Sequence, residues 1–235
     1  MSQIYFIRHG QASFGTDNYD RLSDLGRVQS VIVGDFFAQT KVVFDGVYSG
    51  SLERQTETAA LALARLPGGA VRSSLEIWPE FDEYSSDPVI TTLLPVVVGA
   101  NPELEPLVER MSSDRRSFQV VFEKVMDLWV SGQVPVSEGE SFDDFSQRVS
   151  SGVRKLMAVN GRKKNLAVFS SGGAIAAVMM MALGLAGRMA VKLNWLMKNA
   201  SITTFFYNDS ELMLSSFNST AHLEAKNEAG LITYR

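Results

Sequence analysis

The tripeptide Arg8-His9-Gly10 comes directly after four apolar residues, Ile4 to Ile7. The apolar run is β-branched and aromatic, which is typical of a short buried strand. In an open α/β sheet, ligands bind at the carboxyl ends of strands, and a glycine there lets the chain turn sharply. A cation beside an imidazole suits a phosphate, because Arg binds its oxygens bidentately and His can attack phosphorus or transfer a proton. The tripeptide alone fits a surface Arg and a solvated His equally well, so the rest of the chain must decide.

The remaining chain alternates between strand and helix patterns. We expect further strands at residues 44–48, 71–77 and 166–169, and a hairpin formed by 201–207 and 212–217. Helical spacing lies between them, at residues 24–39, 52–66, 141–159, 173–185 and 190–197. Such alternation implies a mostly parallel sheet with helices on both faces, and the closing hairpin makes the sheet mixed. The expected fold is therefore a three-layer α/β/α sandwich.

Two segments depart from this alternation. Ser13 to Leu22 is polar and contains Gly15, Asp17 and Asn18, which predicts a loop. Pro88 to Val136 shows helical patterns broken by four prolines and reads as a helical insertion that caps the sheet. We expect a single domain over residues 1–235 with this insertion at about 88–136.

Composition excludes several classes of protein. The net charge of −4 argues against a nucleic-acid-binding surface, and the absence of Cys removes disulfides and Cys-based metal sites. With two His in the chain, we expect no metal and no cofactor. The uncharged stretch between Lys164 and Arg188 is long enough to span a bilayer, but Ser170-Ser171-Gly172-Gly173 interrupts it, so a strand, a turn and a buried helix explain it better. No basic region precedes an apolar run at the N-terminus, so we expect a cytoplasmic protein.

Charged and glycine-rich segments follow each of the other parallel strands. Arg54 lies just after the second strand, Glu80 and Glu83 follow the third, and Ser171 with Gly172 follows the fourth. These ends share one edge of the predicted sheet. Two Arg side chains and the amides of a helix N-terminus favour a phosphoryl group at that edge.

Together these segments resemble the histidine phosphatase superfamily, also called the phosphoglycerate mutase-like family. Arg8-His9-Gly10 matches its signature, and 51–59 is similar to its Ser-Pro-Leu-x-Arg-Ala-x-Gln-Thr-Ala, without the Pro. Three other pieces of the pattern occur in the expected order, at residues 22–29, 139–149 and 199–223. The resemblance covers nearly the whole chain, and the joint order is more specific than any single piece.

The resemblance implies a role for each matching residue. His9 is the nucleophile that becomes a phosphohistidine, and Arg8 and Arg54 neutralise the phosphoryl oxygens. Glu80 matches the general acid that protonates the leaving oxygen, with Glu83 as the fallback because the register around it is altered. Gln11 and Ser13 are further candidates for lining the pocket, although loop solvation explains them equally well.

One position departs from the family. Ser171 stands where the family has a His that contacts the phosphoryl group, with Gly172 as the next phosphate-binding residue. A hydroxyl can donate one hydrogen bond but carries no charge, so low activity is expected. His222 is a candidate substitute, although a structural hydrogen bond explains it better.

The expected function is a metal-independent phosphatase acting on a phosphomonoester or a phosphoanhydride. One alternative is a phosphoglycerate mutase-type phosphotransferase, although Gln11 and Ala12 replace the Glu-Ser that follows Arg-His-Gly in those mutases. A second alternative, motivated by Ser171, is a weakly active or non-catalytic protein that binds a phosphorylated ligand. The expected partner is a small phosphorylated substrate or phosphate, not nucleic acid or a membrane, and a homodimer is compatible with this interpretation.

Overall fold

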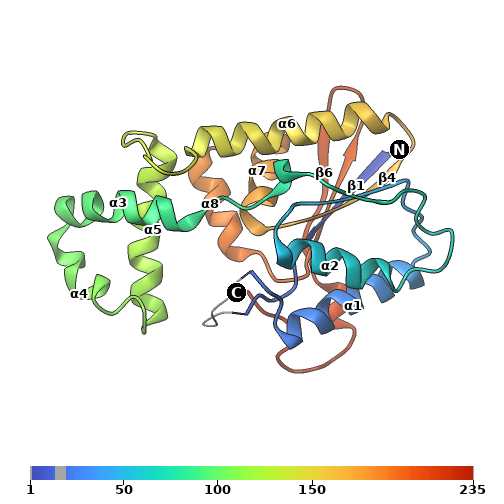
Figure 1. The fold of residues 1–235 in the computed structure, drawn as a ribbon, viewed down its shortest axis with the longest axis horizontal. Coiled ribbons are helices and arrows are strands. Elements are labelled where there is room, and N and C mark those ends of the chain that lie inside the picture. Colours follow the sequence, from blue (N-terminus) through green and yellow to red (C-terminus); the bar gives the residue numbers. More distant parts are fainter. Residues whose placement is uncertain (1, 14–19, 235) are drawn as a thin grey trace. The chain divides into compact units, whose positions relative to one another are not determined.

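The computed structural model describes residues 2–13 and 20–234, and Figure 1 shows their elements in chain order. The described chain divides into two compact units, of which the first runs to Glu83 and resumes at Arg148. The first unit contains the strands β1 (Ser2–Arg8), β2 (Gly46–Ser49), β3 (Leu75–Ile77), β4 (Asn165–Ser170), β5 (Ile202–Tyr207) and β6 (Leu212–Ser219). Its helices are α1 (Asp24–Gln39), α2 (Glu53–Leu63), the 3₁₀ turn η1 (Pro79–Phe81), most of α6 (Phe142–Asn160), α7 (Gly172–Leu183), α8 (Gly187–Leu196) and α9 (Ala221–Glu224).

The six strands form one mixed sheet in the order β3-β2-β4-β1-β5-β6. The first four strands in this order pair in parallel, whereas β5 is antiparallel to both β1 and β6. Arg8 at the end of β1 pairs with Ser170 at the end of β4, and Ser49 at the end of β2 pairs with both Phe169 and Ile77. The carboxyl ends of the four parallel strands therefore meet at one edge. This sheet and its helices confirm the expected three-layer fold.

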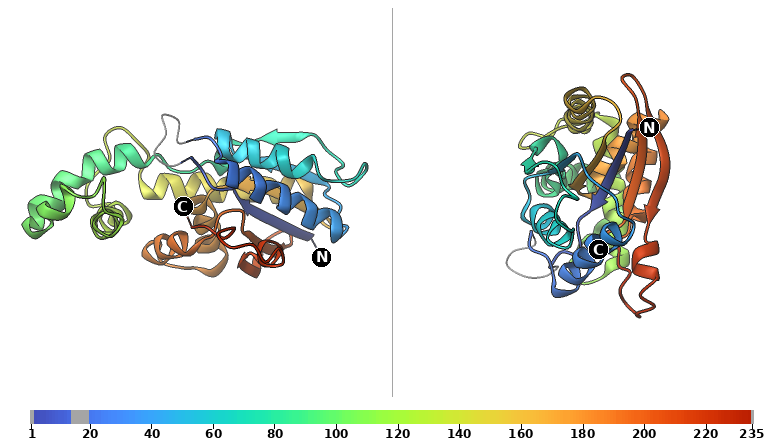
Figure 2. Two further views of the ribbon diagram at one scale, coloured as in Figure 1. Left: turned by 90° about the horizontal axis from the view of Figure 1, so that it is seen from below. Right: turned by 90° about the vertical axis from the view of Figure 1, so that its right-hand side faces the viewer.

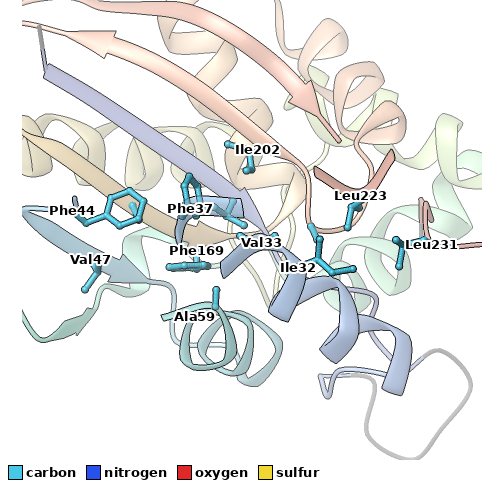
Figure 3. Packing of buried hydrophobic residues seen from close by; sticks show 14 residues of the cluster. Ile32, Val33, Phe37, Phe44, Val47, Ala59, Phe169, Ile202, Leu223 and Leu231 are labelled. Carbon is cyan, nitrogen blue, oxygen red and sulfur yellow. The ribbon is translucent and has the colours of Figure 1, made fainter. Parts of the chain in front are cut away.

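Alternate residues of each strand face opposite layers of helices, as the pleat requires. Tyr5 packs edge-on against Phe37 of α1, whereas Phe6 on the other face contacts Phe81 of η1 and Phe205 of β5. Figures 1 and 2 show α1 and α2 on one side of the sheet and α6 and α7 on the other. The cluster on the α1 side is drawn in Figure 3 and includes two residues of the C-terminal region, Leu223 and Leu231.

The second unit spans Tyr84–Gln147 and is helical. It contains α3 (Ser86–Ala100), η2 (Pro102–Leu104), α4 (Glu105–Val108), α5 (Arg115–Ser131) and the start of α6. Its core forms around Trp129, whose ring contacts Tyr84, Phe142 and Phe145. The helical character of this segment agrees with the sequence pattern, while its role as a cap and its place within one domain stay predictions.

Some local structure differs from the expected pattern. The third strand covers only Leu75–Ile77, with an isolated bridge between Val71 and Phe44, because polar residues between them interrupt the pairing. The chain after Thr220 forms α9 (Ala221–Glu224) and returns to the core through Leu231, although no helix was expected there. The loop expected between Ser13 and Leu22 lies partly outside the described residues, since Gly15, Asp17 and Asn18 belong to 14–19. In the part of the chain that the structure describes, no helix is long and apolar enough to cross a membrane.

Candidate active site

His9 lies one residue beyond β1, and main-chain hydrogen bonds fix its position on both sides. Its N–H donates to Ser170 O at 2.9 Å, and its carbonyl accepts from Ala200 N at 3.1 Å. The side chain is 4% exposed, so the imidazole is held in the interior at the sheet edge. Gly10 is required next to it, because a Cβ there would lie 2.2 Å from the carbonyl oxygen of Gly26.

The contacts of the His9 ring define its two nitrogens. Nδ1 lies 2.7 Å from the carbonyl oxygen of Gly10, which can only accept, so Nδ1 carries the proton in the neutral ring. Nε2 then presents its lone pair and lies 3.3 Å from Nε of Arg54. Burial, reinforced by the charges of Arg54 and Arg8, holds the pKa of His9 well below its usual value. A neutral imidazole with a fixed tautomer is the form that can attack an electrophile.

Two guanidinium groups flank this ring, and each is anchored on its outer side. Arg8 donates through Nη1 to the carbonyl oxygens of Met197 and Tyr234. Arg54, at the start of α2, donates through Nη1 to Asp20 Oδ1 at 2.6 Å. Both Arg side chains are buried, so their charge acts in a medium where it is screened little.

The turn after β4 brings Ser171 and Gly172 to the same edge. The hydroxyl of Ser171 is fully buried and accepts from Gln55 Nε2 at 2.8 Å. A Cβ at position 172 would lie 2.2 Å from Oδ1 of Asn194, so Gly172 lets the Asn194 side chain approach the helix terminus, and it would lie at an ordinary contact distance of 3.5 Å from Nε of Arg8. The structure therefore brings together Arg8, His9, Arg54, Ser171 and Gly172.

The acidic segment after β3 sends its carboxylates to three different elements. Glu80 pairs with Lys155 on α6, with 2.8 Å between Oε1 and Nζ, and this hydrogen bond lowers its pKa. Asp82 accepts from the N–H and hydroxyl of Ser51, before α2. Glu83 accepts from Gly173 N at 2.9 Å, in the first turn of α7. Of the three, Glu83 is therefore the carboxylate in contact with the Ser171–Gly173 turn.

The remaining candidates have framework contacts. The Gln11 side chain accepts from Ser23 Oγ at 2.9 Å, and the main chain of Ser13 donates to Arg21 O. His222 is buried with Nε2 2.9 Å from Ala200 O, and desolvation lowers its pKa to about 4. This contact fits the structural hydrogen bond considered for His222.

Two contacts of the site carried no signal in the sequence. Asp20 holds Arg54 and also accepts from Glu53 N at 2.8 Å, but it belongs to the polar loop expected at 13–22, where no pattern distinguishes it from the other polar residues. The carbonyl of Tyr234 reaches Arg8 from the far end of the chain, and a main-chain contact leaves no side-chain signature. Among the residues that the structure describes, no group of three or more His, Asp and Glu side chains could hold a metal ion.

The chain is similar to a family of known proteins and to individual proteins within it. The profile of the histidine phosphatase superfamily (branch 1) matches residues 4–89 and 114–220. The serine/threonine-protein phosphatase Pgam5, mitochondrial, of Caenorhabditis briggsae is 31% identical over 110 residues. That match covers 47% of this chain and 37% of the relative, so the chain aligns with well under half of that protein.

Solved structures share the fold over nearly the whole chain. Phosphoglycerate mutase from Bacillus anthracis str. Sterne has a TM-score of 0.67 at 20% identity, with 97% of each chain covered. A phosphoserine phosphatase mutant from Entamoeba histolytica, in complex with phosphoserine, has a TM-score of 0.63 at 20% identity and covers 95% of this chain and 100% of its own. At these identities the similarity establishes the fold.

Proposed function

The chain belongs to the histidine phosphatase superfamily, and on this premise we propose that it is a metal-independent phosphatase acting on a phosphomonoester or phosphoanhydride. The observation that carries the proposal is the His9 ring, with its proton directed at Gly10 O and Nε2 beside the guanidinium of Arg54. An imidazole fixed in this way and flanked by cations is suited to attack phosphorus.

In the first step, His9 Nε2 forms a bond to phosphorus and the bond from phosphorus to the ester oxygen breaks. The imidazole becomes positively charged as it is phosphorylated, and the Gly10 carbonyl stabilises that charge through the Nδ1 proton. Arg8 and Arg54 offset the charge of the phosphoryl oxygens throughout the transfer. Because the protein supplies this positive charge from its own side chains, the proposed reaction requires no metal.

The leaving oxygen needs a proton, and Glu83 is the better candidate to supply it. Glu83 lies against Gly173 in the turn beside Ser171, whereas Glu80, favoured by the sequence pattern, is paired with Lys155 on α6. A general acid works best when its pKa is near the operating pH. The hydrogen bond from Lys155 lowers the pKa of Glu80, which moves it further from neutral pH. We therefore assign the role of general acid to Glu83, and we assign to Glu80 a structural role in the ion pair with Lys155.

In the second step, water attacks the phosphohistidine and the bond between phosphorus and Nε2 breaks. Glu83, which gave its proton to the leaving group, takes one from the attacking water and is ready for the next cycle. Ser171 supplies a neutral hydroxyl to this side of the site, so the rate is expected to be low for the family.

The direct test measures turnover of a generic aryl phosphate. The reaction is also quenched without acid, so that an acid-labile phosphoprotein survives and can be detected. We expect an acid-labile phosphoprotein that disappears in His9→Ala, with activity retained in a chelator. The matched control is His222→Asn, which changes the other His and should leave the phosphoprotein in place. Normal turnover by His9→Ala, or complete loss of activity in the chelator with recovery on adding Mg²⁺ or Zn²⁺, would contradict the proposal.

The second candidate is a phosphate-binding protein without useful turnover, and the observation behind it is Ser171. Its hydroxyl is fully buried and accepts a hydrogen bond from Gln55. Because a Ser stands there in place of a His, the position lacks the positive charge of an imidazolium. Calorimetric binding of inorganic phosphate without hydrolysis of any phosphate ester would favour this candidate. A mutase would instead transfer phosphate between two hydroxyls of one acceptor, which is detected with a phosphorylated three-carbon acid.

A further inference from the structure

The last described residues of the chain run from the hydrophobic core to Arg8 in the candidate phosphate site. We call residues 231–234 the C-terminal segment. Leu231 is 3% exposed and packs into the cluster around Ile32 and Val33, beside Leu223 (Figure 3). Beyond this anchor the segment has no helix or strand, so its position depends on individual contacts.

Two buried amide side chains hold the C-terminal segment. Gln29 of α1 donates through Nε2 to Leu231 O at 2.8 Å and to Thr233 Oγ1 at 3.0 Å. The main-chain N–H of Asn199 donates to Thr233 O at 2.8 Å, and its side-chain Oδ1 accepts from Thr233 Oγ1 at 3.0 Å. Thr233 is therefore bonded to both amides, and the next residue is fixed by them.

The same amides are also part of the framework around His9. The other end of Gln29 accepts from Gln11 N at 2.8 Å, two residues after His9. Asn199 precedes Ala200, whose N–H donates to His9 O at 3.1 Å. A displacement of the C-terminal segment would therefore disturb groups that hold the main chain of His9 and Gln11 in place.

The segment ends on Arg8 itself. Tyr234 O accepts from Arg8 Nη1 at 3.1 Å, and Met197 O accepts from the same nitrogen. The five N–H donors of a guanidinium lie in one rigid plane, so fixing one nitrogen in two directions fixes the orientation of the whole group. A carbonyl also carries partial negative charge, which stabilises the cation in its buried position.

We propose that the C-terminal segment is a positioning element of the phosphate site, which orients the Arg8 guanidinium through the carbonyl of Tyr234. The proposal rests on the assignment of Arg8 to phosphate binding in the proposed function. It predicts that the segment acts on affinity for phosphate through Arg8, and not only on the stability of the fold.

The test uses inorganic phosphate, whose binding is measured by calorimetry and needs no turnover. Thr233→Val keeps the shape of the side chain and removes both hydroxyl hydrogen bonds, while a second variant that ends at Ile232 removes the Tyr234 carbonyl. We expect phosphate to bind about tenfold more weakly to the shortened chain, as for loss of one hydrogen bond to a charged group, and several-fold more weakly to Thr233→Val. Thr40→Val, at the residue that follows α1, is the control, because the Thr40 hydroxyl donates to Phe36 O and Phe37 O in the last turn of that helix.

A double-mutant cycle separates positioning from general damage. In an Arg8→Lys background, whose ammonium has no plane to fix, shortening the chain should change phosphate binding less than twofold. Unchanged phosphate binding in the shortened chain, or an equal loss in both backgrounds, would overturn the proposal. If the protein binds phosphate with this dependence but hydrolyses no ester, the proposed function fails while the inference stands.

Discussion

The two sides of the site are built from different kinds of contact. We call Arg8, His9 and Arg54 the nucleophile side, and Glu83 with the Ser171–Gly173 turn the acid side. On the nucleophile side, carbonyls of Gly10, Met197 and Tyr234 fix the His9 ring and Arg8, and these acceptors do not depend on side-chain identity. On the acid side, the Ser171 contact joins two side chains, and Glu83 reaches Gly173 N through its flexible side chain. The nucleophile side is thus tied to the fold, whereas the acid side can change with single substitutions.

The strongest test of this comparison is Glu83→Gln, which removes the proposed acid and keeps the shape of the side chain. We expect kcat to fall by ~10²–10⁴ on alkyl phosphates, the usual contribution of a general acid. The loss on aryl phosphates should be far smaller, because their leaving groups depart without a proton. Steady-state kinetics on the two substrate classes measures the difference.

The matched control is Glu80→Gln, which removes the ion pair with Lys155. The Lys155 side chain is half exposed, so this pair contributes little and the activity should change by no more than a few-fold. If Glu80→Gln gives the larger loss, dependent on the leaving group, the acid is Glu80 as the sequence pattern favoured. A loss from Glu83→Gln that is equal on both substrates would remove Glu83 from the role as well.

A second substitution restores the family residue on the acid side. Ser171→His should raise kcat/KM by up to ~10², because one preorganised donor to a developing oxyanion typically accounts for ~10²–10³ in rate. The ring must take the place of the hydrogen bond between Gln55 and Ser171, so Gln55 has to turn aside. Ser171→Ala is the control and should be slower than the parent protein. A crystal structure with the ring beside His9 and no gain in rate would show that Ser171 is adapted to its own substrate.

The sequence anticipated the nucleophile side better than the acid side, and the reason is physical. Alternating strands and helices place the ends of parallel strands at one edge, so His9 and Arg54 meet wherever their strands are identified correctly. The choice between Glu80 and Glu83 depends instead on how the η1 turn directs neighbouring side chains, which no pattern records. The role of Tyr234 could not be anticipated either, because its contact comes from the main chain.

A third experiment addresses the framework behind the nucleophile side. Burial holds the pKa of His222 at about 4, below the ~6.5 of an exposed imidazole, so between these values the unfolded chain binds a proton that the folded chain does not. Stability should therefore fall as the pH drops from ~6.5 towards 4, by up to ~2 kcal/mol at pH 5 from this residue. His9, whose pKa is also lowered, acts in the same direction.

Urea unfolding at pH 7 and pH 5 measures this effect. In His222→Asn, which keeps a donor for Ala200 O, the difference between the two pH values should shrink. An identical pH dependence in the parent protein and the variant would mean that folding leaves the pKa of His222 unchanged. His9 then provides the remaining dependence, which is seen directly in a titration of its ring by NMR.

The smallest expected effect concerns Asp20, whose carboxylate anchors Arg54 on the nucleophile side. Asp20→Asn keeps an acceptor for Glu53 N but removes the charge facing Arg54, where the carboxylate is one-third exposed. A partly exposed pair contributes roughly 0.2–1 kcal/mol, so kcat/KM should fall by at most about fivefold, mainly through a higher KM. Asp24→Asn, which removes an exposed pair with Arg27 on α1, is the matched control and should change nothing. A rise in kcat/KM would reverse the interpretation, because Asp20 would then compete with phosphate for Arg54 instead of presenting it. The direction of this small change therefore decides whether the nucleophile side is fully preorganised or held back by its own carboxylate.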